Sequence, residues 1–162
     1  MNIEISNRQS RRRVNRKKLS SFSRWLMERI EDVDPGRNWT TLSVILVDDE
    51  GMIPIQRACF GANEPTDVIS LAYDPIPPEG DGRDGEVIVN VQRAHEVGGA
   101  DGCSRELALY LAHGCQHLTG ASDETPALRA AMRRKETAWL NTAERLGLLT
   151  GLIQEPERPS AQ

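Results

Sequence analysis

The sequence has few cysteines and no long apolar segment. Its three cysteines, Cys59, Cys103 and Cys115, are an odd number without a close pair. This pattern argues against a disulfide framework and favours a reducing compartment. No apolar run is long enough to span a membrane, and the first residues lack the apolar core of a secretory signal. We therefore expect a cytoplasmic protein without a membrane partner.

Hydrophobic residues make up only 38% of the 162 residues. The length is sufficient for one domain with its own core. We therefore expect a modest core and an extensive polar surface. We assign residues 1–150 to this domain and residues 151–162 to a frayed tail, because the last residues are rich in Pro, Ser and Gln.

The hydrophobic pattern predicts an α+β fold: a single compact domain with a four-stranded mixed sheet and about five helices. Alternating or β-branched segments predict strands at 2–6, 40–47, 66–71 and 86–91. Helical spacing and turn residues predict helices near 19–32, 52–60, 91–97, 104–119 and 126–149. A Pro-, Gly- and acid-rich connection at 73–86 would allow the third and fourth strands to be neighbours.

Two histidines and an aspartate surround the end of the fourth predicted helix. His113 and His117 are four residues apart, which places both imidazoles on one helix face. Gly120 stands where a residue of positive φ commonly ends a helix, and Asp123 follows three residues later. Two ring nitrogens and a carboxylate oxygen, with a fourth position open, form the ligand set of a catalytic zinc site. We predict a metal site on this helix and the loop after it.

The residues around this motif have roles of their own. Ser104 is the predicted N-cap of the helix, and Glu106 lies in the first turn. Glu106 shares the face of the histidines, so it either orients a ligand ring or only stabilises the helix start. The alternative role of Asp123 is that of an N-terminal carboxylate on the next helix. His95 is distant in sequence and is interpreted as a surface or loop residue.

Basic residues are clustered although the net charge is −4. The first cluster runs from Arg8 to Lys18 without an acidic residue, and the second runs from Arg129 to Lys135. Such asymmetry can guide a polyanion to one surface of an acidic protein. The alternative is that both clusters are ordinary solvated helix faces. The candidate substrate-binding residues are Arg12, Arg13, Arg16 and Arg133.

Three motifs in order resemble those of the bacterial rRNA-maturation endoribonuclease family called YbeY. Its signature His-Gly-x-Leu-His-Leu-x-Gly-x-Asp-His appears at 113–123 as His-Gly-Cys-Gln-His-Leu-Thr-Gly-Ala-Ser-Asp. Its Thr-Asp-Val-Leu-Ser-Phe strand appears at 66–71 as Thr-Asp-Val-Ile-Ser-Leu. Its Gly-Asp-Ile-x-Ile-Ser strand appears at 85–90 as Gly-Glu-Val-Ile-Val-Asn. The resemblance extends from residue 2 to about residue 148.

The resemblance implies one zinc ion per chain and hydrolysis of single-stranded ribosomal RNA. It implies work on the small ribosomal subunit, including the 3′ end of its RNA and its quality control, with no DNA partner. Asp123 replaces the third metal histidine of the family, and Phe60 and Gln56 stand where the family has arginine and asparagine. The candidate catalytic residues are Arg57, Ser70 and Glu106.

Two other functions fit parts of the sequence. The spacing of His113, His117 and Asp123 is also that of the long zinc-peptidase signature, in which a glutamate after the first histidine is the general base. Here that position is Gly114, which argues against peptide hydrolysis. A ribosome-assembly factor that binds RNA around a structural metal is the non-enzymatic alternative, and Phe60 and Gln56 favour it.

Overall fold

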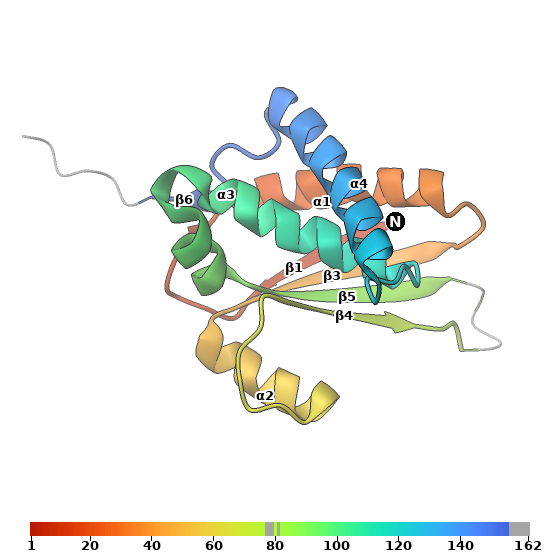
Figure 1. Ribbon diagram of the computed structural model, residues 1–162, viewed down its shortest axis with the longest axis horizontal. Coiled ribbons are helices and arrows are strands. Elements are labelled where there is room, and N and C mark those ends of the chain that lie inside the picture. Colours follow the sequence, from red (N-terminus) through yellow and green to blue (C-terminus); the bar gives the residue numbers. More distant parts are fainter. Residues whose placement is uncertain (77–79, 81, 156–162) are drawn as a thin grey trace, which may run out of the picture.

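Four strands form one mixed sheet in the order β1-β3-β5-β4 (Figure 1). The computed structural model describes residues 1–76, 80 and 82–155. Strands β1 (Asn2–Asn7), β3 (Trp39–Val47) and β5 (Arg83–Asn90) are parallel, and β4 (Val68–Tyr73) runs antiparallel to β5. The predicted pairing of the third and fourth main strands is therefore confirmed. Part of the predicted connection, 77–79 and 81, lies outside the described residues.

The sheet is buried on both faces by different sets of side chains. Val44, Leu46, Val87 and Val89 share the larger core with α1 (Arg16–Val33) and α3 (Val91–Leu118). Alternate positions such as Ile45, Val47 and Ile88 pack with Met52 of α2 (Asp49–Phe60) in a second core. In Figure 1, α2 lies alone on one side of the sheet, and α1, α3 and α4 (Pro126–Arg145) lie on the other. The near-continuous apolar sequence of β3 follows from this double burial.

Helix starts follow the capping rules. Asn15, Asp48 and Thr125 cap α1, α2 and α4, and each side chain accepts a hydrogen bond from a backbone N–H of the first turn. Pro126 stands at the first turn of α4, as predicted. The last helix ends at Arg145 rather than near residue 149, because Gly147 has a φ of +75° and turns the chain. In the described part of the chain, no helix has the length and apolar character needed to cross a bilayer.

Helix α3 confirms one prediction and corrects two others. The break expected at Gly98-Gly99 is present as a kink at Gly99, whose φ of +68° is not helical. The helical segments on either side of it together form α3, so the described residues contain four helices and not five. Ser104 is not an N-cap. Ser104 lies within α3, where its hydroxyl donates to the carbonyl of Ile153 and accepts from the N–H of Ile153. His95 also lies in α3 and not in a loop.

The frayed tail predicted for residues 151–162 is wrong in its first part. Leu152 and Ile153 are buried, because their apolar side chains pack in the larger core. The strand β6 (Ile153–Gln154) pairs antiparallel with β2 (Arg13–Val14). Residues 156–162 lie outside the described part of the chain. The C-terminal segment therefore belongs to the fold as far as Glu155.

Candidate metal centre

The three predicted ligands converge on one point. The Nε2 atoms of His113 and His117 are 3.0 Å apart. Oδ2 of Asp123 lies 3.7 Å from the first of these nitrogens and 3.4 Å from the second. Zinc bonds of about 2.0–2.2 Å at tetrahedral angles place neighbouring N and O donors about 3.3–3.6 Å apart. The observed separations of 3.0–3.7 Å bracket this range, so small shifts of the side chains would let all three atoms bind one tetrahedral ion.

The remaining ring nitrogens determine what these three atoms can bind. Nδ1 of His117 lies 3.1 Å from the carbonyl oxygen of Ala121, which only accepts, so this nitrogen carries the proton. Nδ1 of His113 donates in the same way to Oε1 of Glu136, at 2.6 Å. In the neutral rings, both Nε2 atoms then present lone pairs to each other and to the Asp123 carboxylate. Three converging acceptors are stabilised by a cation.

Glu136 is a residue of the candidate site that the sequence analysis missed, and it contacts His113. It lies on α4, has an exposed fraction of only 5%, and also accepts from Nε2 of Gln116 at 3.0 Å. Its hydrogen bond is the main reason why the pKa of His113 is raised, and the Asp123 carboxylate adds to this effect. Glu136 stands four residues from both Met132 and Leu140, in the buried stripe of α4. A carboxylate inside an apolar stripe is the signal that could have identified it.

Asp123 is positioned by the turn that ends α3. Gly120 has the positive φ expected of a helix stop, at +85°. The backbone carbonyl of Asp123 accepts a hydrogen bond from the guanidinium of Arg129, at 3.1 Å. The N-cap of α4 is Thr125, so the Asp123 carboxylate faces the histidines rather than capping the next helix.

Gly114 brings the motif helix against the sheet. A Cβ at this position would lie 2.7 Å from Cγ1 of Val87 and 2.9 Å from Oγ of Ser70. The Ser70 hydroxyl donates to the Gly114 carbonyl at 2.8 Å, which ties β4 to α3. A glutamate side chain in place of Gly114, as in the zinc peptidases, has no room here. Cys115 is fully buried in the core, and burial raises the pKa of its thiol to about 12.

Two hollows flank the ligands. The first, of about 380 Å³, contains His113, Asp123 and Glu136 together with the basic residues Arg93, Arg129 and Arg133. Glu106 and Asp67 supply further carboxylates to it, and Tyr110 is also part of the lining. Burial, reinforced by Glu106, raises the pKa of Tyr110. The second hollow, of about 370 Å³, contains all three ligands together with Ser70 and Phe60, which is 65% exposed.

Four of the candidate catalytic and substrate-binding arginines lie away from the candidate metal centre. Of the residues described as lining these two hollows, none is Arg12, Arg13, Arg16 or Arg57. Arg12 lines a separate hollow beside His95, Arg13 lies in β2, and Arg16 begins α1. The guanidinium of Arg57 donates to Asn63. Of the candidates, Ser70, Glu106 and Arg133 line the same hollows as the predicted ligands.

Comparisons with known proteins identify relatives of this chain. A family model described as Endoribonuclease YbeY matches residues 4–144. A relative named Endoribonuclease YbeY from Moorella thermoacetica is 31% identical over 150 residues, covering 86% of this chain and 96% of that protein. Another of that name, from Rhodopirellula baltica, is 35% identical over 113 residues, covering 67% of this chain and 55% of that protein.

A solved structure has the same fold. The solution structure of TM1509 from Thermotoga maritima matches with a TM-score of 0.57 over 99% of each chain, at 19% identity. The family model matches residues 4–144, which include β3, β4, β5, most of β1 and the whole 113–123 motif. On this extent of agreement in sequence and in fold, the chain belongs to the YbeY family.

Proposed function

We propose that this protein is a zinc-dependent endoribonuclease that hydrolyses phosphodiester bonds in single-stranded ribosomal RNA. The single observation that carries the proposal is the convergence of three hydrogen-bond acceptors, from His113, His117 and Asp123, within 3.7 Å of one another. The names of the relatives supply the reaction class. The expected target is small-subunit RNA, including its 3′ end, in ribosome maturation and quality control in the cytoplasm.

His113, His117 and Asp123 would hold one zinc ion per chain. When bound, the ion supplies Lewis acidity toward a phosphate oxygen and toward the attacking water. Glu136 keeps the proton of His113 on Nδ1, so that Nε2 remains free to ligate. The carbonyl of Ala121 does the same for His117. Because Asp123 adds a negative charge where the family has a neutral ring, we expect the attacking water to be less acidic than with three imidazoles.

Arginines at the first hollow can bind the RNA backbone. Arg93, Arg129 and Arg133 line the same hollow as two of the ligands, so phosphates next to the scissile bond would meet positive charge there. Arg12, Arg13 and Arg16 remain proposed contacts for RNA that extends away from the ligands. Glu106 and Asp67 are further carboxylates of this hollow that can accept a proton during the reaction. The Ser70 hydroxyl already donates its hydrogen to the carbonyl of Gly114.

A non-catalytic RNA-binding assembly factor is the second candidate, and one observation favours it. Phe60 occupies the place of the family arginine, and it lines the second hollow beside all three ligands. The guanidinium that would face substrate there is replaced by an apolar ring. Arg57 does not compensate in the described structure, because its guanidinium is directed to Asn63.

Incubation with end-labelled single-stranded RNA separates the two functions. The substrate is a small-subunit 3′-end segment, with and without a chelator and with zinc restored. Cleavage that requires the metal and is lost in Asp123→Ala supports the nuclease. Binding without metal-dependent cleavage supports the assembly factor. A peptide substrate, incubated with the protein in the absence of RNA, tests the peptidase alternative, and it should remain intact.

A further inference from the structure

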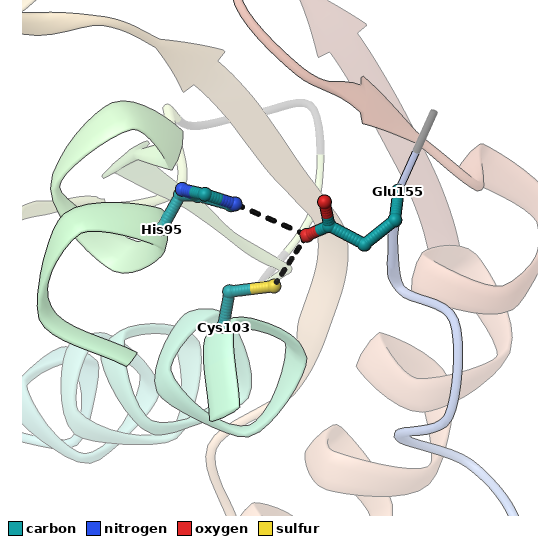
Figure 2. A group of neighbouring side chains, drawn as sticks. All are labelled: His95, Cys103 and Glu155. Carbon is teal, nitrogen blue, oxygen red and sulfur yellow. Dashed lines mark hydrogen bonds and ion pairs between the residues drawn. The ribbon is translucent and has the colours of Figure 1, made fainter. Parts of the chain in front are cut away.

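A second group of metal-ligating side chains lies away from the candidate centre. His95 and Cys103 come from α3, on opposite sides of its kink, and Glu155 follows β6 (Figure 2). Nε2 of His95 lies 3.0 Å from Oε1 of Glu155, and Sγ of Cys103 lies 3.8 Å from the same oxygen. All three ligand atoms lie within 4.8 Å of one another.

The kink in α3 is what brings the first two residues together. In an uninterrupted helix, residues 95 and 103 would be separated by about 12 Å along the axis, at about 1.5 Å per residue. Gly99 breaks the helix with a φ of +68°. Gly98 lets the two segments approach, because a Cβ there would lie 2.8 Å from the backbone N and Cα of Cys103. The glycine pair therefore positions imidazole and thiol side by side.

Independent contacts position the third residue. The strand β6 pairs with β2, and the N–H of Asn15 donates to the carbonyl of Leu152. The Ser104 hydroxyl accepts from the N–H of Ile153 at 3.0 Å and donates to its carbonyl. Ser104 is the neighbour of Cys103, so the backbone before Glu155 is fixed directly next to the thiol.

We propose that His95, Cys103 and Glu155 bind a second divalent ion of zinc's chemistry, which ties the C-terminal strand to the kinked helix. A thiolate together with an imidazole and a carboxylate selects zinc or cobalt over magnesium or calcium. The separations of 3.0 Å and 3.8 Å bracket the spacing of about 3.3–3.8 Å between donors on a tetrahedral zinc ion. One thiolate, one carboxylate and one divalent ion sum to zero charge.

The three side chains of this site differ in burial, from the buried Cys103 to the exposed Glu155. Cys103 is 1% exposed, whereas the Glu155 side chain is 42% exposed, so water can reach the fourth position. Burial and the Glu155 carboxylate raise the pKa of the Cys103 thiol. Without an ion the thiol is therefore the favoured form, and a bound divalent ion would supply the positive charge that favours the thiolate. The rival arrangement is an ordinary His95–Glu155 ion pair beside a protonated thiol.

Cobalt substitution tests the second site without reference to RNA cleavage. Only a sulfur ligand gives a thiolate-to-cobalt charge-transfer absorption, and the centre at His113, His117 and Asp123 has none. We expect this band when the metal-free full-length chain is titrated with Co²⁺. It should persist in Asp123→Ala and in the matched cysteine control Cys59→Ser, and disappear in Cys103→Ser. Glu155→Gln, an exposed and conservative change, should weaken cobalt binding by more than the roughly 10–100-fold cost of losing an outer-sphere partner.

Thermal unfolding provides a second measurement. In the double variant His117→Ala, Asp123→Ala, which lacks two of the three ligands of the first centre, added Zn²⁺ should raise the melting temperature because it binds the folded state. The increase should vanish when Glu155→Gln is added to that background. Absence of the band in the wild-type chain at excess Co²⁺, or its persistence in Cys103→Ser, would overturn the proposal. So would an equal zinc effect on melting with and without Glu155→Gln.

Discussion

The two groups of ligands differ in how the fold assembles them. His113, His117 and Asp123 lie within eleven consecutive residues, and helix geometry with one glycine stop brings them together. His95, Cys103 and Glu155 span sixty-one residues and meet only because α3 is kinked and β6 pairs with β2. Local geometry can be predicted from sequence, whereas a meeting of distant segments cannot. The first group was therefore predicted and the second was not.

The groups also differ in their outer contacts. The first is supported by Glu136 and by the Ala121 carbonyl, which leave both Nε2 atoms as acceptors. The second carries a thiol and an exposed carboxylate next to a water-accessible position. We interpret the first as a catalytic centre. We interpret the second as a clamp, meaning a structural metal site that holds β6 against α3. Variants that separate these roles test this distinction.

The largest expected effect is that of His113→Ala on RNA cleavage. Loss of a direct ligand should exceed the roughly 10–100-fold cost of losing an outer-sphere partner, so the cleavage rate should fall more than about 100-fold. Gel-based cleavage rates at saturating zinc measure this effect. The matched variant is His95→Ala on the same helix, which should retain cleavage. Equal losses in both variants would remove the distinction between centre and clamp.

Glu136→Gln should have the next largest effect. The neutral amide is a weaker acceptor for the Nδ1 proton of His113, so zinc affinity should fall by about 10–100-fold while the fold is retained. Competition with a chromophoric chelator measures the affinity. Glu144→Gln is the control on the same helix, because Glu144 pairs with Arg105 at the surface. An unchanged affinity in Glu136→Gln would show that the carboxylate has only a packing role.

Gly114→Ala tests the contact between helix and sheet. The added methyl would meet Val87 and Ser70 at 2.7–2.9 Å, and overpacking of this kind costs about 1–3 kcal/mol of unfolding free energy. Gly102→Ala in the same helix has nothing within 4 Å and should be neutral or stabilising by up to about 1 kcal/mol. Urea unfolding of both variants measures the difference. Equal stabilities would contradict the close approach at Gly114.

The smallest expected effect concerns the arginines. Arg129→Gln and Arg133→Gln should each reduce the slope of log affinity against log salt by about 0.7, the value for one phosphate contact on a single strand. Fluorescence anisotropy with labelled RNA at several salt concentrations measures the slopes. Arg12→Gln and Arg16→Gln test contacts away from the ligands in the same assay. Unchanged slopes for Arg129→Gln and Arg133→Gln would show that RNA phosphates do not bind in the first hollow.

Several features of the fold could be predicted because they depend on short-range rules. The four main strands, the helix break at Gly98-Gly99, the Thr125-Pro126 start of α4 and the 113–123 motif all follow from periodicity, capping and turn chemistry. The family assignment follows from three ordered motifs and is confirmed by the family model.

Other features depend on which surfaces meet. Ser104 has the side chain of an N-cap, but its hydroxyl bonds the backbone of Ile153, 49 residues away. Leu152 and Ile153 lie next to a polar tail in the sequence and are nevertheless buried. Glu136 and His95 are ordinary polar residues until α4 and β6 are placed against α3. No local pattern encodes these partners.

The central claim is that His113, His117 and Asp123 jointly hold a divalent ion. Elemental analysis of zinc-saturated Cys103→Ser, in which the second group is disabled, tests it most directly. The account predicts one zinc per chain in this variant and none when Asp123→Ala and His117→Ala are added. A zinc content near zero in Cys103→Ser alone, or the same content in the combined variant, would contradict it.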